Sequence, residues 1–299
     1  MGGIKMKKDL SLGPKIIIYA FLGLCCLLCV IPIITVVSIS FSSDIRIMKE
    51  GYGIFPKGMT LDAYKFVFKD AAAILRSYGV TILVTVLGLV IGLTLNSMIA
   101  YVLSRKDYAW RKPLTVFLII PMVLNGGMVP TYIWLTKYLH LKNTIWAMLL
   151  PMLIVPWFII LMRTFFTQLP ASLMEAATVD GAGELTIFTK IVLPLAKPAL
   201  ATVGMFITLN YWNDWFQPLM YIDNRELYNL QYRLYVLMRD VQEMIKNSAI
   251  SGMGISMVDM PTESMRMAMC VIAAGPMLAV FPFFQKYFVK GLTVGGVKG

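Results

Sequence analysis

Six long apolar runs constrain this chain more than any other feature of its sequence. A helix rises about 1.5 Å per residue, so roughly 20 apolar residues cross a hydrocarbon core about 30 Å thick. The runs cover residues 16–41, 79–104, 114–136, 144–162, 198–222 and 267–285. Asp214, in the fifth run, is the only charged residue among them. Charged residues make up 14% of the 299 positions, whereas a soluble domain carries about 25%. The sequence therefore predicts an all-α integral membrane protein with six transmembrane helices.

Basic residues in the short segments between the runs predict the orientation. Residues 1–15 contain four lysines, and residues 105–113 contain four basic residues, Arg105, Lys106, Arg111 and Lys112. Because short cytoplasmic segments are enriched in Lys and Arg, we expect both termini to face the cytoplasm. The first run exceeds the roughly 7–15 apolar residues of a secretory signal, so we interpret it as a retained span.

The predicted layout is a cytoplasmic segment 1–15, a six-helix transmembrane domain 16–289 and a cytoplasmic tail 290–299. Its long loops are the inner loop 163–197 and the outer loops 42–78 and 223–266, where function is expected to lie. The net charge of +11 needs no nucleic-acid partner, because the positive-inside bias accounts for it.

Several kinds of chemistry find no support in the sequence. The four cysteines, Cys25, Cys26, Cys29 and Cys270, lie inside apolar runs and indicate neither a disulfide framework nor a zinc site. The single histidine, His140, lies in a short outer loop without the partners that a metal or catalytic site needs. No phosphate-binding Gly-x-x-x-x-Gly-Lys-Ser/Thr loop occurs. We expect no enzyme activity and no cofactor or metal bound by this chain.

The last outer loop contains an amphipathic pattern. Apolar residues recur at spacings of three and four, at Leu227, Leu230, Leu234, Leu237, Val241 and Met244. This periodicity predicts a helix of about five turns with one apolar stripe. Two interpretations stay open: the helix packs on the protein's own outer surface or the bilayer interface, or it docks an extracytoplasmic partner.

The inner loop 163–197 contains small residues and helix signals. Ser172 followed by Glu175 fits a capping box, Gly181 and Gly183 are expected to end that helix, and Pro194 the next one. Ala177 and Gly181 lie one turn apart, with Ala176 alongside, so one face of the helix is expected to be nearly flat. Such a face suits docking, although a small-residue turn packed against the lipid is an equal alternative from the chemistry alone.

The residues of this loop resemble a known signature. Glu175-Ala176-Ala177, Gly181, Ile191 and Leu193-Pro194 match the EAA signature of membrane subunits of ATP-binding-cassette (ABC) importers. The six runs, Trp212-Asn213-Asp214-Trp215 and the tail Gly291–Gly299 resemble the maltose-type carbohydrate permeases. Residues 125–132 resemble the branch that includes oligosaccharide permeases for plant or algal polysaccharide fragments.

The resemblance implies a type I ABC importer permease fold in the bacterial cell membrane. It implies a second related permease subunit, two cytoplasmic ATPases that use ATP and Mg²⁺, an extracytoplasmic solute-binding lipoprotein and an oligosaccharide substrate. It also implies that residues 175–181 form a coupling helix held by an ATPase. The coupling residues are Glu175, Ala176, Ala177, Asp180, Gly181, Ile191, Leu193 and Pro194. The tail residues Gly295, Gly296 and Lys298 are expected to lie along the ATPase, unless the tail is disordered.

Polar residues in the spans are candidates for the substrate path, because polar groups in lipid generally face a cavity or a partner. They are Asn210, Trp212, Asn213, Asp214, Trp215 and Asn125. Aromatic rings and amides suit sugars, but Asp214 has a structural alternative as a cap or bridge between helices. Asn96 and the Gly88-x-x-x-Gly92 face are better explained by helix packing. A secondary transporter using Asp214 as an ion site is the alternative function.

Overall fold

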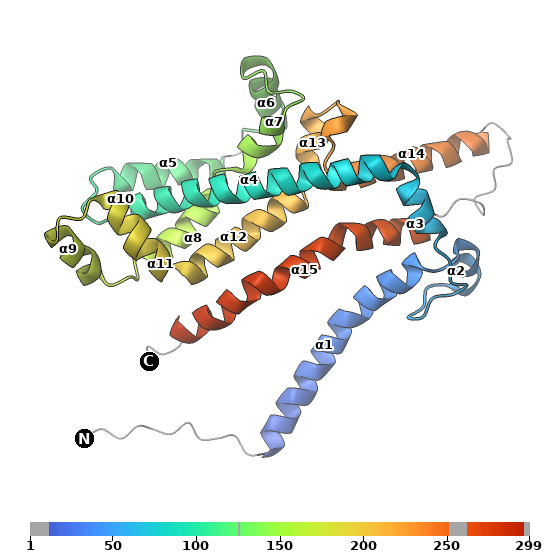
Figure 1. Ribbon diagram of the computed structural model, residues 1–299, viewed down its shortest axis with the longest axis horizontal. Helices are drawn as coiled ribbons and strands as arrows, with labels where there is room; N and C mark the ends of the chain where they lie inside the picture. Colours follow the sequence, from blue (N-terminus) through green and yellow to red (C-terminus); the bar gives the residue numbers. More distant parts are fainter. Residues whose placement is uncertain (1–11, 125, 251–261, 296–299) are drawn as a thin grey trace. The chain divides into compact units, whose positions relative to one another are not determined.

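The computed structural model describes residues 12–124, 126–250 and 262–295, and these residues are helical apart from loops and one isolated bridge between Ser42 and Met59 (Figure 1). The prediction of an all-α fold is confirmed for this part of the chain. The α-helices are α1 (Leu12–Ser40), α2 (Asp44–Glu50), α3 (Asp62–Val67), α4 (Ala71–Ser104), α5 (Arg111–Val123), α6 (Met128–Ile133), α7 (Ile145–Leu149), α8 (Pro156–Phe166), α9 (Ala171–Val179), α10 (Glu184–Ile187), α11 (Leu193–Leu195), α12 (Lys197–Trp212), α13 (Phe216–Tyr221), α14 (Leu230–Ile250) and α15 (Glu263–Gly295). The short 3-10 turns are η1 (Phe68–Asp70), η3 (Leu150–Met152) and η5 (Arg225–Leu227), and the π turns are η2 (Trp134–Tyr138) and η4 (Phe188–Val192).

The chain divides into two compact units, residues 1–69 with 241–272 and residues 70–240 with 273–299. In the first unit, Asp44 of α2 holds the start of α15. Its Oδ1 accepts hydrogen bonds from the backbone N–H of Glu263 (2.9 Å) and of Ser264 (3.3 Å). The Tyr52 hydroxyl donates to Glu263 (3.1 Å), and this bond to a carboxylate raises the pKa of Tyr52. The unit's outer segment is therefore tied to the beginning of its last helix.

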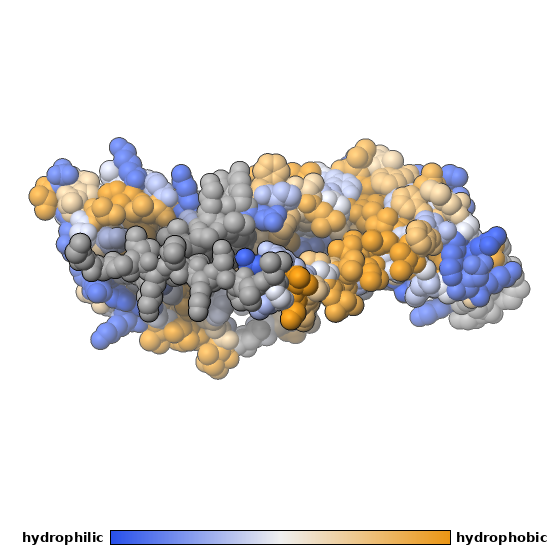
Figure 2. All heavy atoms as spheres, turned by 90° about the horizontal axis from the view of Figure 1, so that it is seen from below, coloured by the Kyte–Doolittle hydropathy of each residue, from blue (hydrophilic) through white to orange (hydrophobic). Residues whose placement is uncertain are grey.

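Side chains of α1 from Gly13 to Val37 are exposed or only partly buried. Large apolar side chains also lie at the surface of α4, α5 and α15. Figure 2 shows extensive hydrophobic areas on the face that it presents. In water this exposure would be costly, but in a bilayer it presents apolar atoms to lipid or to another membrane subunit.

The second unit is built around α4, which packs along α8 and α12 (Figure 1). The closest approach is at Gly88, where a Cβ atom would lie 2.2 Å from the ring of Tyr211. Tyr211 is fully buried, and its hydroxyl donates to the Leu149 carbonyl (2.8 Å). The packing role expected for the Gly88–Gly92 face is confirmed at Gly88, because only glycine leaves room for this aromatic ring.

Asn96 connects α4 to the break before α8. Its Nδ2 donates to the Leu153 carbonyl (2.7 Å), and its Oδ1 accepts from the Val155 N–H (3.0 Å). These backbone groups lie where Pro156 begins α8 and the helical ladder is interrupted. A buried amide thus satisfies groups that lipid cannot satisfy, which confirms the structural interpretation of Asn96.

Within the described residues, three helical segments are long and apolar enough to cross a membrane, residues 13–40, 62–104 and 263–285, and there are up to six if each of three bent pairs counts as one span. The pairs are residues 111–123 with 128–138, 145–152 with 156–166, and 184–195 with 197–212. The two segments of the second pair meet at a bend of 49°, and those of the third pair meet at a bend of 84°. The count of six and the orientation of the termini stay predictions, so "inner" and "outer" name the sides that this orientation predicts.

Three predicted spans are interrupted in the structure. The fourth, expected over 144–162, divides into α7, η3 and α8. The third run was expected to be one helix over 114–136, but α5 ends at Val123 and α6 begins at Met128, after Gly127 with φ of 89°. The fifth was expected to reach residue 222, but α12 ends at Trp212 and α13 is a separate short helix. Hydropathy cannot detect such breaks, because the residues on both sides of each break are apolar.

Candidate functional site: the inner helix and the outer cluster

The helix α9 lies between α8 and α10, in the inner loop that carries the signature residues. It begins at Ala171, directly after Pro170, and no side chain caps its first turn. The predicted capping box of Ser172 and Glu175 is therefore wrong. Pro170 occupies the position directly before the helix instead. Its fixed φ suits the entry to a helix, and it has no N–H group that would need an acceptor.

Gly181 ends α9, as predicted. The N–H of Ala182 donates to the carbonyl of Ala177 (2.9 Å), and the N–H of Gly181 donates to that of Thr178 (3.0 Å). This pair of bonds is the Schellman arrangement, in which the residue after the cap adopts a left-handed conformation. Gly181 has φ of +81°, which a β-carbon makes unfavourable.

The side chains of α9 divide into an inward and an outward set. Met174 and Ala177 are partly buried against the core of the unit. Glu175, Ala176 and Asp180 are exposed, and the apolar side chain of Val179 is 88% exposed. The structure thus separates two neighbours that were expected to share one docking face: Ala177 points inward, whereas Ala176 lies outside.

Arg105 connects α9 and α10 to the inner end of α4. Its guanidinium forms an ion pair with Glu184 of α10 (3.1 Å) and contacts the sulfur of Met174 (3.7 Å). The other carboxylate oxygen of Glu184 accepts a hydrogen bond from the Tyr101 hydroxyl. Sequence reasoning missed this cluster, because its members are far apart in the chain and only Arg105 was noted, for its charge.

The second half of the signature lies in a different environment. Ile191 and Leu193 are partly buried and pack against the core of the unit, next to the buried Phe188 and Val192. Pro194 is exposed inside α11, and the chain bends after it at Ala196. The expectation that Pro194 ends its helix is corrected by one residue: Pro194 lies inside α11, which follows the π turn η4 and ends at Leu195. The signature therefore joins an exposed helix to an anchored one.

A cavity of about 470 Å³ lies under the start of α9. Its lining includes Ser104, Arg105, Asp107, Phe166, Met174 and Glu175. The helix thus stands partly clear of the inner ends of α4 and α8 and is held mainly through Arg105, Met174 and α10. A force applied to its outward side would reach α4 through these contacts.

The predicted substrate-path residues lie near the outer ends of α12 and α14. Asp214 is buried, and its Oδ1 accepts hydrogen bonds from the backbone N–H of Phe216 and of Gln217 (both 3.1 Å). Its own carbonyl accepts from the Asn229 side chain. Asp214 therefore holds the start of α13 and the entry to α14, which is the structural alternative considered for it.

Trp212 also bonds the protein's own backbone. Its indole is buried, and Nε1 donates to the Ala273 carbonyl of α15 (2.9 Å). By contrast Asn210, Asn213 and Trp215 are exposed, and Trp215 stacks on Tyr235 of α14 with ring centroids 5.3 Å apart. Asn125, Gly296 and Lys298 lie outside the described residues, and Gly295 is the last residue of α15.

Tyr235 belongs to an aromatic row that sequence reasoning missed. Tyr232 and Tyr235 lie three residues apart on α14, Tyr228 lies just before this helix, and neighbouring rings lie 4.6 Å and 6.2 Å apart. The apolar stripe drew attention instead. Leu230, Leu234 and Val241 of that stripe are buried within the chain. The interpretation that this stripe packs on the protein itself is therefore favoured.

The outer loops are joined by a second polar contact. The backbone of Asn143 has φ of 60°, and its side-chain oxygen accepts hydrogen bonds from the N–H groups of Asp223 (2.6 Å) and Asn224 (3.0 Å). Lys142 bonds the Asp223 carboxylate (2.7 Å), and this bond raises the pKa of the ammonium. The segment before α7 is thereby connected to the segment after α13.

Long apolar helices joined by buried polar bridges, with one exposed, well-terminated helix between α8 and α10, are the features of a multi-pass membrane protein. The chain belongs to the family of binding-protein-dependent transport system inner membrane components, whose model matches residues 88–294. These are non-catalytic, multi-pass membrane permeases of ABC importers, which work with partner ATPases and a substrate-binding protein.

Named relatives cover almost the whole chain. The chain is 38% identical to Protein LplC of Bacillus subtilis over 93% of this chain and 92% of the relative. It is 37% identical to the polygalacturonan/rhamnogalacturonan transport system permease protein YtcP of the same organism, over 95% and 97%. Among solved structures, a bacterial ABC transporter involved in import of the acidic polysaccharide alginate matches with a TM-score of 0.76 and 30% identity, covering 96% of this chain and 100% of that chain.

Proposed function

We propose that this chain is a permease subunit that moves oligosaccharides into the cell, and that α9 is the helix through which a partner ATPase drives it. The observation that carries the proposal is the exposed outward side of α9, formed by Glu175, Ala176 and Val179, on a helix whose inward side is tied to α4. Relatives named for polygalacturonan, arabinooligosaccharides and maltodextrin support the substrate class.

The proposed assembly contains a second, related permease subunit and two ATPases. ATP and Mg²⁺ are bound by those ATPases, since this chain has no phosphate-binding loop of its own. Closure of the ATPases on nucleotide would rotate the seated α9, and contacts through Arg105 and Glu184 would shift the equilibrium between inward-open and outward-open arrangements.

The set of residues that we propose to contact sugar is smaller than the set predicted from the sequence. Trp215, with Tyr235 stacked on it, offers an exposed aromatic face, and Asn213 and Asn210 offer exposed amides. Aromatic faces and amides are the groups that bind sugar rings and hydroxyls. We leave Trp212 and Asp214 out of the proposed sugar contacts, because both side chains are buried and Trp212 Nε1 and Asp214 Oδ1 bond the protein's own backbone, whereas Asp214 Oδ2 has no hydrogen-bond partner among the described residues.

Secondary transport through Asp214 is not favoured by the relatives or by this geometry. The carboxylate caps α13 instead of lining an open ion site. Uptake driven by an ion gradient in vesicles without ATP would support that alternative.

The test is to replace Ala176 by Trp, which places a large side chain on the outward side of α9. The control Ala72→Trp makes the same chemical change at an exposed position of α4. We expect Ala176→Trp to abolish co-purification of the ATPase and uptake of labelled galacturonate or arabinose oligosaccharides, with unchanged thermal unfolding of the chain. Normal assembly and uptake in Ala176→Trp would contradict the proposal.

A further inference from the structure

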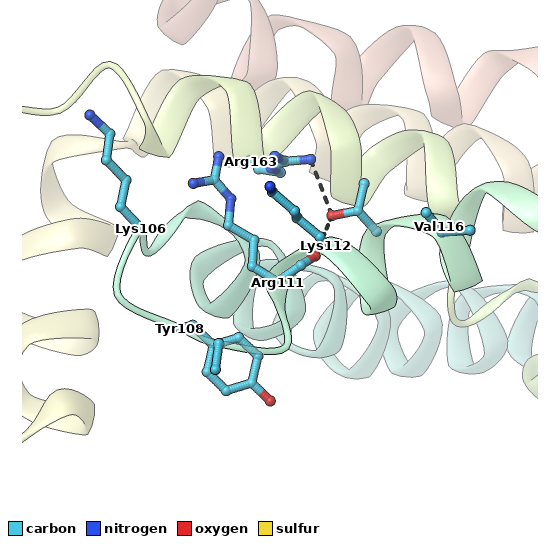
Figure 3. A pocket seen from close by; sticks show the side chains of 8 residues that line it. Lys106, Tyr108, Arg111, Lys112, Val116 and Arg163 are labelled. Atoms are coloured by element: carbon cyan, nitrogen blue, oxygen red, sulfur yellow. Dashed lines mark hydrogen bonds between the residues drawn. The ribbon is translucent and has the colours of Figure 1, made fainter.

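A strongly basic cavity of about 760 Å³ lies in the second unit, between the start of α5 and the end of α8. Its lining includes Lys106, Tyr108, Arg111, Lys112, Thr115 and Arg163. Four of these residues are cationic and none is acidic. Figure 3 shows Arg111, Lys112 and Arg163 reaching toward the same space, while Tyr108 points away from them.

The cations have little protein to neutralise them. In the part of the chain that the structure describes, none of the four forms an ion pair, and Asp107, adjacent in sequence, bonds Arg105 instead (3.3 Å). Arg163 Nη1 donates to the hydroxyl of Thr115 (3.4 Å), which in turn donates to the Arg111 carbonyl (2.7 Å). Like charges gathered in this way repel one another, so a bound anion would stabilise the site.

The start of α5 adds to the attraction. Arg111 is its first residue, and no side chain caps this 13-residue helix. The Arg111 N–H donates to the Tyr108 carbonyl (3.2 Å) and Pro113 has no N–H, so the attraction comes from the positive end of the helix dipole and from the side chains. Two guanidinium groups facing one cavity suit the several oxygens of a phosphate.

The surroundings of the cavity indicate a membrane interface. Tyr108 and Trp110 are 38% and 65% exposed, and aromatic residues of this kind concentrate at the level of lipid headgroups. Further along α5, the apolar side chains of Val116 and Phe117 are 59% and 69% exposed, where acyl chains would lie. A polar anion and an apolar tail would both find partners here, which distinguishes a lipid from an acidic protein segment.

We propose that this cavity binds the phosphate headgroup of an anionic membrane phospholipid. Basic cavities between helices on the cytoplasmic side are suited to such headgroups. The bound lipid would fix the inner end of α5 against α8 and neutralise the charges that the chain leaves unpaired.

The test measures retention of phosphatidylglycerol by the assembled transporter, using native mass spectrometry from mixed micelles. Arg111→Gln combined with Lys112→Gln removes two cavity charges. The matched control, Lys69→Gln with Lys137→Gln, removes two exposed lysine charges elsewhere. At about fivefold per basic residue near an anionic headgroup, the cavity variant should bind phosphatidylglycerol about 30-fold more weakly, and the control should be unchanged.

Further arms identify the source of the phosphate and guard against misfolding. Phosphatidylcholine should be retained equally by all forms, and inorganic phosphate should not displace phosphatidylglycerol. Thr115→Glu supplies an anion from the chain itself, so it should abolish retention while leaving thermal stability equal or higher. Equal retention of phosphatidylglycerol in the cavity variant, or displacement by inorganic phosphate, would overturn the proposal. Loss of the ATPase from the cavity variant with lipid retention unchanged would overturn it as well, in favour of protein docking.

Discussion

The inner helix α9 and the outer cluster around Asp214 both contain recognisable sequence motifs, but the motif residues are exposed in the first and buried in the second. In α9 the signature residues Glu175 and Ala176 are left exposed, and the backbone alone terminates the helix. In the outer cluster Trp212 and Asp214 are buried, and Trp212 Nε1 and Asp214 Oδ1 bond the chain's own backbone. The difference teaches that a polar residue in a membrane segment can serve to join helices, whereas docking needs residues that the fold leaves free.

The largest effect is expected from a change at the end of α9. Two glycine-to-valine variants distinguish the effect of backbone conformation from that of side-chain size. Gly181→Val places a β-branched residue at φ of +81°, which costs roughly 1–3 kcal/mol and unwinds the last turn. Gly183→Val makes the same chemical change at φ of −72°, which valine adopts readily. Nothing lies within 4 Å of either added Cβ atom, so crowding does not differ.

We expect Gly181→Val to abolish ATP-driven uptake of oligosaccharides into proteoliposomes, and Gly183→Val to retain most of this uptake. Equal uptake by the two variants would mean that the conformation of this helix end has no part in coupling.

The next effect concerns the stability of the outer cluster. Asp214→Ala leaves the N–H groups of Phe216 and Gln217 without their acceptor, which should lower the free energy of unfolding by about 1–2 kcal/mol. Asp214→Asn keeps an acceptor oxygen and should retain both stability and ATP-driven uptake. Chemical denaturation in detergent and uptake assays check the pair. Complete loss of uptake in Asp214→Asn with normal stability would favour an ion-coupled role for the carboxylate.

A smaller effect is expected at the connection between α9 and the core. Arg105→Gln or Glu184→Gln removes an ion pair whose carboxylate side is 60% exposed, so each should lower uptake by about fivefold at most. If the two residues act through one another, the double variant should be no worse than either single variant. ATPase co-purification should persist in all three. Additive losses would show that each residue acts independently.

A separate effect, on the affinity for sugar and not on maximal uptake, is expected at the exposed aromatic face. Trp215→Ala removes a ring that stacks on Tyr235, and an aromatic contact of about 0.5–1.5 kcal/mol corresponds to a roughly 2–10-fold higher sugar concentration for half-maximal uptake. Trp215→Phe should restore most of the affinity. Trp134→Ala, at another exposed tryptophan, serves as the control and should change nothing. An unchanged concentration in Trp215→Ala would exclude this face from the sugar path.

Much of this architecture could be predicted from the sequence, because apolar runs report where helices meet lipid. The helix at residues 171–179 and its end at Gly181 also followed from local signals. The Ser172 capping box was wrong because Pro170 already starts the helix. The breaks near Gly127 and after Trp212 were missed because they interrupt runs that remain apolar.

The side-chain pairings could not be predicted, because they depend on which distant residues the fold brings together. Glu184 meets Tyr101 and Arg105 across about 80 positions of the chain, and no local pattern marks them. The inward orientation of Ala177 depends likewise on packing against the core. The tyrosine row of α14 did carry a local signal in its spacing, which the adjacent apolar stripe obscured.

Crosslinking from α9 tests the central claim most directly. A photoreactive side chain is placed at position 176 in the assembled transporter, and at exposed position 72 as a control. We predict an adduct between position 176 and the ATPase, stronger or weaker according to the nucleotide present, and none from position 72. An adduct of position 176 with lipid or the solute-binding protein, and none with the ATPase in any nucleotide state, would contradict the account.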